Sequence, residues 1–212
     1  MNQTVERASI ERTTARAAAS TEAFYRENAQ SYFHRTFELQ MDHLYRPFLE
    51  AVGDGRRLLD VGCGSGRDVK AFRVLGYDAF GIDPSPDLVA LATAHAGPYF
   101  SVARAETYKA HDRFDGVWAC ASLLHLRRAD LHSTMRNLRA LLKQGGVLFA
   151  SVQLGAGDCA QPDGRWYIYY SAAEFKDATT ESGLMVLRSW ETNDVLRNDG
   201  PTWINILARR EH

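Results

Sequence analysis

An aspartate followed by glycines at alternate positions marks the stretch of this sequence best suited to hold a ligand. The stretch reads DVGCGSG from Asp60 to Gly66, and it follows directly on the apolar residues Leu58 and Leu59. Glycine is typical of positions where a backbone turns sharply or where another group comes close to it. In α/β proteins, a glycine-rich turn between a strand and a helix commonly holds a nucleotide-like ligand. We therefore expect a ligand site where the first strand ends.

The spacing of these glycines argues against a dinucleotide. A dinucleotide fingerprint, G-x-G-x-x-G counted from Gly62, needs a third glycine at position 67, and the sequence has Arg67 there. The carboxylate of Asp60 would also repel a pyrophosphate, whereas it suits a ligand that carries an ammonium group. An NAD(P)-dependent oxidoreductase is therefore a disfavoured alternative.

The residues around this turn predict the strands and helices that position it. From Arg56 onward, apolar strand-like runs alternate with helical segments, which is typical of a mostly parallel sheet with right-handed crossovers. Ser171 and Glu174 form an expected capping box of a late helix, and Pro47 is expected to kink or split the helix before the first strand. The last two strands have no helix between them, which predicts an antiparallel pair. The expected strands are 57–61, 77–83, 99–103, 115–122, 147–153, 185–192 and 203–209.

The glycine turn and four later motifs together resemble class I S-adenosylmethionine-dependent methyltransferases. The turn matches the family's first motif, D-x-G-x-G-x-G, and the resemblance covers residues 24–210. It implies an α/β, Rossmann-like, mostly parallel sheet of seven strands in the order 3-2-1-4-5-7-6, with the last strand antiparallel, helices on both faces and an N-terminal helical lid. The later motifs are Asp83 at the end of the second strand, Ala105-Glu106 after the third, FDGV from Phe114 and LKQGGVLFAS from Leu142.

The same resemblance implies S-adenosyl-L-methionine as the cofactor and assigns residues to it. The carboxylate of Asp60 favours the ammonium group, and Gly64 lets the backbone approach the methionine portion. Asp83 is expected to accept charge-assisted hydrogen bonds from both ribose hydroxyls, and Ala105 and Glu106 are expected to contact the adenine. The cofactor-binding residues implied in the core are Asp60, Gly62, Cys63, Gly64, Asp83, Pro84, Ala105, Glu106 and Cys120.

The segment before the first strand adds a predicted lid. Residues 28–49 resemble the corresponding segment of small bacterial methyltransferases of the tellurite-resistance and related small-molecule type. That resemblance places Tyr25, Tyr32 and Arg35 in the closed cofactor site, with Arg35 as a partner for the cofactor's carboxylate. The alternatives are ordinary helix packing for the two tyrosines and a solvated surface position for Arg35.

Residues after the fourth strand and in the lid are candidates for the methyl-acceptor site. Methyl transfer is an in-line displacement, so correct placement can suffice and a general base is optional. His125 is the candidate general base and also a substrate-binding candidate, because imidazole accepts protons near neutral pH. The alternative for His125 is a histidine that only holds the structure. His34 and His43 in the lid are further candidates for the base, and His34 is also assigned to the substrate.

The segment GAGDCAQPDGRWYIYY predicts a second wall of the acceptor site. Its aromatic residues within 166–170 can line a pocket, and Arg165 can receive an anion. The alternative interpretation is an extra strand in which Trp166, Ile168 and Tyr170 share one face, and the two interpretations are compatible. The residues assigned to the substrate in this segment are Arg165, Trp166 and Tyr169.

Composition restricts the partners and the compartment. Net charge is −1 at pH 7, so no general basic field attracts nucleic acid or an anionic membrane, and neither is an expected partner. No apolar run approaches the roughly 20 residues that span a bilayer, and the N-terminus carries charges where a signal peptide is apolar. The three cysteines are far apart, which predicts free thiols in a reducing cytoplasm and no metal site.

We therefore expect a cytoplasmic enzyme, monomer or homodimer, that methylates a small molecule. The expected organisation is a flexible or weakly helical leader over 1–23 and a single methyltransferase domain over 24–212. A non-catalytic protein that binds S-adenosylmethionine or S-adenosylhomocysteine is a second alternative, because methyl transfer needs no obligatory catalytic residue. The expected parts of the domain are a lid (24–53), a cofactor-binding core (56–154) and an acceptor-side loop, helix and hairpin (155–212).

Overall fold

The computed structural model describes residues 19–197 and 199–211, and its strands belong to two sheets. The strands are β1 (Arg57–Val61), β2 (Asp78–Asp83), β3 (Phe100–Val102), β4 (Phe114–Ala119), β5 (Leu142–Gln153), β6 (Asp158–Ala160), β7 (Trp166–Ile168), β8 (Leu184–Asn193) and β9 (Thr202–Arg210). The helices are α2 (Ala29–Thr36), α3 (Asp42–Val52), α4 (Arg67–Val74), α5 (Pro86–Ala96), α6 (Leu131–Leu141) and α7 (Ala172–Glu181), with short 3-10 turns η1 (Leu123–His125) and η2 (Arg128–Asp130). A further helix, called the first helix below, covers residues 19–27.

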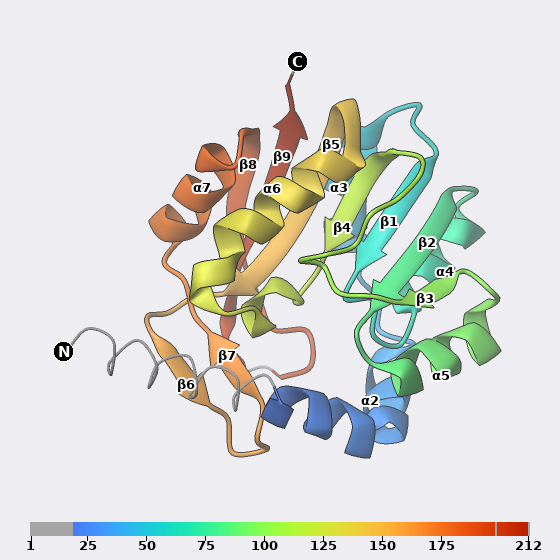
Figure 1. The fold of residues 1–212 in the computed structure, drawn as a ribbon, viewed down its shortest axis with the longest axis vertical. Coiled ribbons are helices and arrows are strands. Elements are labelled where there is room, and N and C mark those ends of the chain that lie inside the picture. The colour runs from blue at the N-terminus through green and yellow to red at the C-terminus, as the bar shows by residue number, and fades with distance from the viewer. Residues whose placement is uncertain (1–18, 198, 212) are drawn as a thin grey trace.

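The main sheet confirms the predicted topology. Its seven strands lie in the order β3-β2-β1-β4-β5-β9-β8 (Figure 1). The strands β1 to β5 pair in parallel, whereas β9 is antiparallel to both β5 and β8. With β8 and β9 as the sixth and seventh strands, this is the order 3-2-1-4-5-7-6 expected of a Rossmann-like α/β sheet.

The helix ends follow the local sequence. Leu88 N–H donates to the Ser85 hydroxyl at the start of α5, and the predicted capping box of Ser171 and Glu174 is present at the start of α7. Of the two expectations for Pro47, a kink or a split, the split does not occur, because α3 runs continuously through the proline. Leu44, Tyr45 and Phe48 are buried on both sides of the proline, and this packing stabilises the helix across it.

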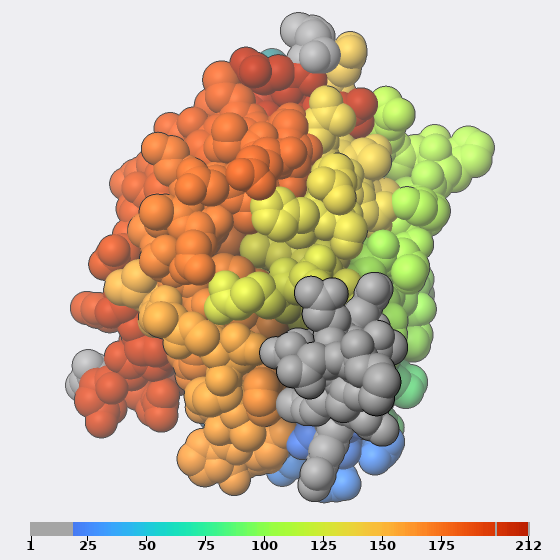
Figure 2. Space-filling model, turned by 60° about the vertical axis from the view of Figure 1, so that its left-hand side comes forward, coloured from blue at the N-terminus to red at the C-terminus, as the bar shows by residue number. Residues whose placement is uncertain are grey.

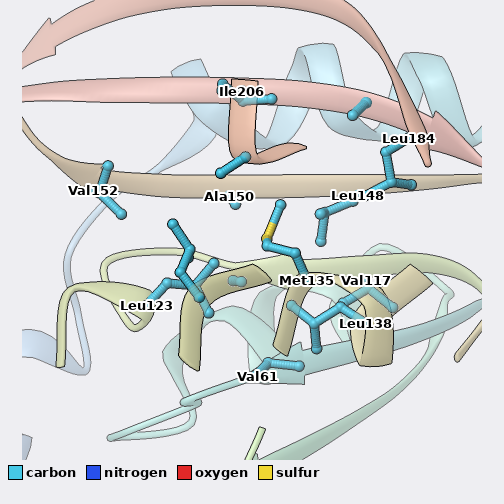
Figure 3. Close-up of a cluster of buried hydrophobic side chains, with 14 of the residues drawn as sticks. Val61, Val117, Leu123, Met135, Leu138, Leu148, Ala150, Val152, Leu184 and Ile206 are labelled. Atoms are coloured by element: carbon cyan, nitrogen blue, oxygen red, sulfur yellow. The ribbon is translucent and has the colours of Figure 1, made fainter. Parts of the chain in front are cut away.

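The central strands bury different residues on their two faces. On one face, Met135 and Leu138 of α6 point toward Leu148 and Ala150 of β5 (Figure 3). On the other face, Trp118 of β4 packs under α3 and α4, where apolar and aromatic side chains form a second core. Strands covered on both faces are typical of a parallel sheet between helical layers.

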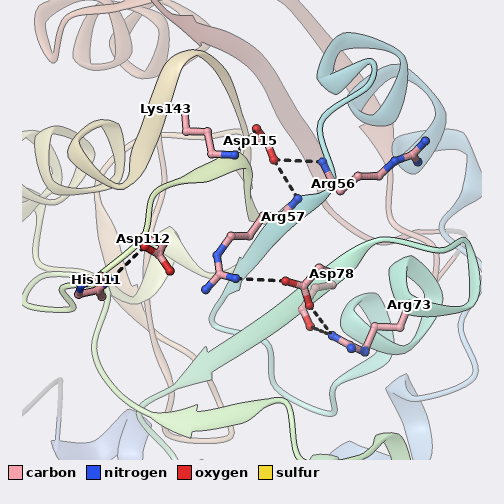
Figure 4. Close-up of polar contacts among 9 residues, drawn as sticks. Arg56, Arg57, Arg73, Asp78, His111, Asp112, Asp115 and Lys143 are labelled. Carbon is pink, nitrogen blue, oxygen red and sulfur yellow. Dashed lines mark hydrogen bonds and ion pairs between the residues drawn. The ribbon is translucent and has the colours of Figure 1, made fainter.

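Charged contacts hold the amino ends of the strands. The Asp115 carboxylate at the start of β4 accepts hydrogen bonds from the backbone N–H groups of Arg56 and Arg57, at 3.0 and 2.9 Å, and pairs with Lys143 of β5 at 2.8 Å. Asp78 at the start of β2 pairs with Arg57 at 3.1 Å (Figure 4). These contacts join β1, β2, β4 and β5 at the amino edge of the sheet, where these strands begin. The site lies at the opposite, carboxyl edge, where they end.

The N-terminal segment and the β6–β7 hairpin close over the carboxyl edge of the sheet (Figure 1). The Ser20 hydroxyl donates to the Gly164 carbonyl, and Trp166 N–H donates to the Thr21 hydroxyl at 2.9 Å. Figure 2 shows the described start of the chain, in blue, next to the orange hairpin on the surface. Thr21 is buried, so the expected leader boundary at residue 23 falls inside the packed first helix, while residues 1–18 of that leader lie outside the described residues. Within the described chain, no helix is long and apolar enough to cross a membrane.

Trp118→Ala should lower the free energy of unfolding by about 3–5 kcal/mol, the usual cost of a large cavity in a core. The Trp118 ring is fully buried and stacks on Phe149, with ring centroids 4.0 Å apart. Urea denaturation followed by circular dichroism measures the loss. Leu75→Ala, at a side chain that is 54% exposed, is the control and should change stability by less than about 0.5 kcal/mol. A Trp118→Ala loss as small as that of the control would contradict the packing described above.

Candidate functional site

The turn after β1 has a backbone that only glycine readily adopts. Gly62 and Gly66 have φ values of 73° and 80°. A Cβ atom on Gly62 would lie 2.4 Å from Cβ of Ser122, and one on Gly66 would lie 2.8 Å from Cβ of Ala92. Glycine therefore lets the turn pack between η1 and α5 while its own backbone faces the carboxyl edge of the sheet.

Asp83, at the end of β2, is held by backbone donors. Its Oδ2 accepts from Gly64 N–H and its Oδ1 from Ser85 N–H, both at 2.9 Å. Burial raises the pKa of Asp83 to about 6, although these two hydrogen bonds oppose the rise. A carboxylate has about four lone-pair sites, so each oxygen retains a free acceptor position. The arrangement suits a ligand with two neighbouring hydroxyl groups.

A cavity of about 230 Å³ lies beside Asp83, and we call it the cofactor cavity. Glu22 and Thr21 of the first helix close its outer side, and Glu22 pairs with Arg104. Asn137 of α6 shapes its far wall by donating to the Ala105 carbonyl at 2.8 Å. The sequence-predicted residues that line it are Tyr25, Tyr32, Gly62, Gly64, Asp83, Pro84, Ala105, Glu106, Cys120 and His125.

Three residues predicted to bind the cofactor do not line this cavity. Arg35 and Cys63 line the larger cavity described below, and Asp60 lines neither of the two. Asp60 is 3% exposed, and its Oδ2 has no hydrogen-bond partner. Burial, with the nearby charge of Asp68, raises its pKa. A buried carboxylate oxygen without a donor fits a cationic ligand group that approaches through the glycine turn.

A buried ion pair at the start of α4 was missed by the sequence analysis. The Arg67 guanidinium donates to both oxygens of Asp68, at 2.6 and 2.9 Å. Asp68 also accepts from the Tyr45 hydroxyl and from the Trp118 indole N–H. Burial alone would raise the pKa of Asp68, but Arg67 and these hydrogen bonds lower it. In the sequence, Arg67 served only as evidence against a dinucleotide, and the adjacent Asp68, directly after the glycine turn, was the available signal for the pair.

A larger cavity of about 860 Å³ adjoins the first, and we call it the acceptor cavity. Cys120 and Ala121, after β4, line both cavities. Ala121 has φ of 53°, and it is the sole non-glycine residue with positive φ among the residues described. Such a conformation is strained, and strained backbone is concentrated at functional sites. The residues that line both cavities are Tyr25, Tyr32, Gly62, Cys120, Ala121 and His125.

His125 lies in this shared wall within a chain of hydrogen bonds. Its Nδ1 lies 3.2 Å from the Trp166 carbonyl oxygen and its Nε2 lies 2.9 Å from the Tyr25 hydroxyl. Because a carbonyl only accepts, Nδ1 carries the proton, and Nε2 accepts from Tyr25. Burial lowers the pKa of His125 to about 4, so the ring is neutral near pH 7. A neutral imidazole with its lone pair at the meeting point of two cavities can accept a proton there.

The alternation of side chains along a strand decides which of the other predicted acceptor-side residues line the cavity and which pack against the core. Tyr167 and Tyr169 line the acceptor cavity together with Arg165, whereas Tyr170 packs into the core. Trp166 packs against the core and contacts His125 only through its carbonyl, so the prediction that its side chain binds substrate is not supported by its position. The extra strand predicted here is confirmed as β7.

The predicted substrate-binding residue His34 is not brought to the site. Its side chain is exposed and lines neither cavity. It follows the buried Phe33 in α2, and a helix turns neighbouring side chains about 100° apart, so His34 faces away from the site. Across the described residues, no group of three or more His, Cys, Asp or Glu side chains is placed to hold a metal ion.

Comparison with known proteins identifies the family. Residues 32–207 match the family described as "Methyltransferase domain". A ubiquinone biosynthesis O-methyltransferase of Nitrobacter winogradskyi is 34% identical over 102 residues, which are 46% of this chain and 38% of that protein. One from Methylobacterium nodulans is 28% identical over 69% of this chain and 66% of that protein. The first of these matches thus spans less than half of the relative's length.

Solved structures share the fold. The 1,6-didemethyltoxoflavin-N1-methyltransferase of Burkholderia thailandensis, solved with 1,6-didemethyltoxoflavin and S-adenosylhomocysteine, has a TM-score of 0.70 at 21% identity and covers 90% of this chain and 88% of its own. Magnesium protoporphyrin IX methyltransferase of Synechocystis PCC 6803, solved with S-adenosylmethionine, has a TM-score of 0.70 at 14% identity and covers 92% of this chain and 97% of its own.

The His125 ring should remain neutral, with its proton on Nδ1, from pH 8 down to about pH 5. The physical reason is the burial that lowers its pKa to about 4. Nitrogen chemical shifts of the ring in ¹⁵N-labelled protein measure both the tautomer and the charge. The signal is assigned by its loss in His125→Gln. A charged ring at pH 6, or a proton on Nε2, would contradict the hydrogen-bond chain.

Proposed function

The chain belongs to the methyltransferase family, of the class I, S-adenosylmethionine-dependent type, and from this premise we propose that it transfers a methyl group to a small-molecule acceptor. One observation carries the proposal. The cofactor cavity and the acceptor cavity meet at a common wall formed by residues such as Gly62, Ala121 and His125. In-line displacement needs a methyl donor and a nucleophile on opposite sides of one point, and this junction supplies that point.

We propose the following roles on the cofactor side. When bound, S-adenosylmethionine supplies a methyl group on a sulfonium. Asp83 accepts hydrogen bonds from the ribose hydroxyls, and Ala105 with Glu106 contacts the adenine at the far wall. Asp60 favours the ammonium group through a water molecule, because its unpartnered oxygen lies behind the glycine turn. Arg35 lies across Tyr32, 5.7 Å from that ring, where it can pair with the carboxylate.

The two cysteines near the junction are suited to a site that holds a sulfonium. Burial raises the pKa of Cys120 to about 12 and also raises the pKa of Cys63. Both thiols therefore remain protonated near neutral pH, and a protonated thiol is a poor nucleophile. The reactive methyl group is thus protected from attack by the protein.

On the acceptor side, we propose that His125 is the general base. The acceptor's hydroxyl or ring N–H takes the place of the Tyr25 hydroxyl at Nε2 and gives its proton to that nitrogen. With the cofactor bound, its methyl group would pass from the sulfonium to the acceptor, and His125 would hold the acceptor's proton until the products leave. The Trp166 carbonyl holds the ring throughout through Nδ1–H.

The compartment, the oligomeric state and the absence of a nucleic-acid partner are also proposals. We propose a cytoplasmic protein that is a monomer or homodimer and binds no nucleic acid, which its net charge of −1 supports. The relatives are named for methyl transfer to oxygen and one structural neighbour for transfer to a ring nitrogen, so both atoms belong in the acceptor screen.

One experiment distinguishes an enzyme that transfers the methyl group from a protein that only binds the cofactor. The purified protein is incubated with methyl-labelled S-adenosylmethionine and fractions of a small-molecule extract, and S-adenosylhomocysteine is quantified. An enzyme forms S-adenosylhomocysteine only when an acceptor fraction is present. A protein that binds the cofactor without transferring the methyl group gives tight binding and no product with any fraction.

The affinity for S-adenosylhomocysteine should fall by about tenfold between pH 7.5 and pH 5. The pKa of Asp83 is about 6 in the free protein, so below that pH a proton must leave before both oxygens can accept from the ribose. Isothermal titration calorimetry across this range measures the slope. Asp83→Asn should bind weakly at every pH and lose the slope.

Asp87→Asn is the matched control for the Asp83 experiment. Asp87 lines the same cavity but is exposed, so this variant should keep the wild-type slope. An unchanged affinity in Asp83→Asn would count against the assignment of Asp83 to the ribose.

His125→Gln should lower kcat by about 100-fold or more at unchanged affinity for S-adenosylhomocysteine, the usual scale for the loss of a general base. Steady-state kinetics with the acceptor found in the screen and calorimetry with S-adenosylhomocysteine measure the two quantities. His43→Gln is the control, because His43 is an exposed histidine of the same acceptor cavity and should keep wild-type turnover. Wild-type turnover in His125→Gln would leave His125 a structural role only.

A further inference from the structure

One face of the sheet changes from apolar to polar residues where it forms the floor of the acceptor cavity. Along one face of β5, Val147 and Phe149 are buried in the apolar core, and the next residues on that face are Ser151 and Gln153. Apolar residues would continue this face if it only had to pack. The change to polar residues coincides with the start of the cavity, which both of them line.

The neighbouring strand supplies the rest of the floor. In the antiparallel register, Ser151 lies opposite Asn205 of β9, and Gln153 lies opposite Trp203. Directly paired residues point to the same face, so these side chains form two adjacent rows. The polar ones are deeply buried, at 2% exposure for Ser151, 7% for Gln153 and 0% for Asn205. A buried polar group needs a hydrogen-bond partner.

Asn205 leaves one such group unpaired. Its Nδ2 donates to the Trp190 carbonyl at 3.3 Å and to the Thr192 hydroxyl at 3.0 Å. Because a carbonyl only accepts, this contact fixes the orientation of the amide and identifies the other atom as Oδ1. Asn205 Oδ1 is buried and has no hydrogen-bond partner. The floor therefore holds a strong acceptor that lacks a donor.

Gln153 adds a complete amide beside it. Its side chain makes no hydrogen bond with any other residue in the described part of the chain. Ser151, in contrast, already accepts from Ala121 N–H at 2.8 Å. The floor thus offers the acceptor of Asn205 together with a donor and an acceptor from Gln153.

We infer that this floor binds the uncharged edge of a flat ring in which an N–H or O–H donor stands beside a carbonyl or ring-nitrogen acceptor. The donor satisfies Asn205 Oδ1, and Gln153 pairs with the rest of the edge. Tyr167, Tyr169 and Trp203 line the same cavity and provide aromatic surfaces for a flat ring. The inference rests on the proposed function, and it deepens that function by naming the class of acceptor.

Two of the carboxylates that line the cavity already have partners within the chain. Asp163 pairs with Arg165 at 2.7 Å, and the Asp194 carboxylate accepts from the Trp203 indole N–H at 3.1 Å. At the floor itself, none of the side chains of Ser151, Gln153 and Asn205 is ionisable. A carboxylate or phosphate has no proton to give to Asn205 Oδ1, and it would be buried there without a cation.

The test uses the full chain saturated with S-adenosylhomocysteine and three flat probes in calorimetry. Lumazine carries ring N–H groups beside carbonyls, its N,N′-dimethyl derivative lacks those donors at nearly the same shape, and naphthoate is a flat anion. Lumazine should bind at least about tenfold more tightly than either of the others, the scale of one or two hydrogen bonds. Asn205→Leu should remove the preference for lumazine over its dimethyl derivative, because it removes the acceptor for the ring N–H. Gln153→Leu should weaken the binding of lumazine by about tenfold.

Asn193→Leu is the matched control, because it makes the same change as Asn205→Leu at an exposed position of the same cavity, and it should keep the preference. Equal binding of the dimethyl derivative, tighter binding of naphthoate, or no binding by any probe at millimolar concentration overturns the inference. A preference that survives in Asn205→Leu, or unchanged lumazine binding in Gln153→Leu, overturns it too. Failure to bind S-adenosylhomocysteine is a separate result, since it contradicts the proposed function.

Discussion

The site depends on how the turn after β1 is fastened to the end of β2. Gly62 and Cys63 donate their N–H groups to the Ile82 carbonyl, and Gly64 N–H donates to the Asp83 carboxylate. The turn can make these bonds only because glycine allows its backbone to bend with positive φ and to pass close to Ser122. The same bonds place Asp83 at the cavity with two acceptor positions still free. The hydrogen bonds between the turn and the end of β2 therefore fix both the turn and the position of the Asp83 carboxylate.

The two ends of the strands have different roles in the sheet. The turn after β1 lies at the carboxyl edge, where the cavities are. Charged groups such as Asp115 and Asp78 hold the amino edge, where partly exposed ion pairs with arginine and lysine fix the strand starts. The carboxyl edge is closed by segments distant in sequence, since Thr21 of the first helix accepts a hydrogen bond from Trp166 of β7. The closing segments also contribute Tyr25 and Tyr167 to the cavities. The amino edge thus holds the strands in place, and the carboxyl edge forms the cavities.

The sequence predicted what depends on local pattern and missed what depends on register. The order of the sheet and the positions of Gly62 and Asp83 follow from short motifs at strand ends, where the carboxyl ends of parallel strands must meet. Asn205 could not be predicted, because its place in the floor depends on which residue of β5 it faces. Trp166 was assigned to the substrate for its aromatic ring, although the alternation along β7 turns that ring into the core. Arg67 was noticed, but its partner became clear only from the structure.

The buried position of His125 is compatible with its proposed role as a base, because the proposed reaction would move a positive charge and create none. In the free protein, a charged imidazole would be surrounded by buried groups, and burial lowers the pKa of the ring to about 4. In the proposed reaction, a bound sulfonium would bring one positive charge to the junction, and transfer of the methyl group would remove it. The proton accepted at Nε2 restores a single charge a short distance away. The site therefore needs no extra solvation during the step, and closure by the first helix, which excludes water, does not oppose it.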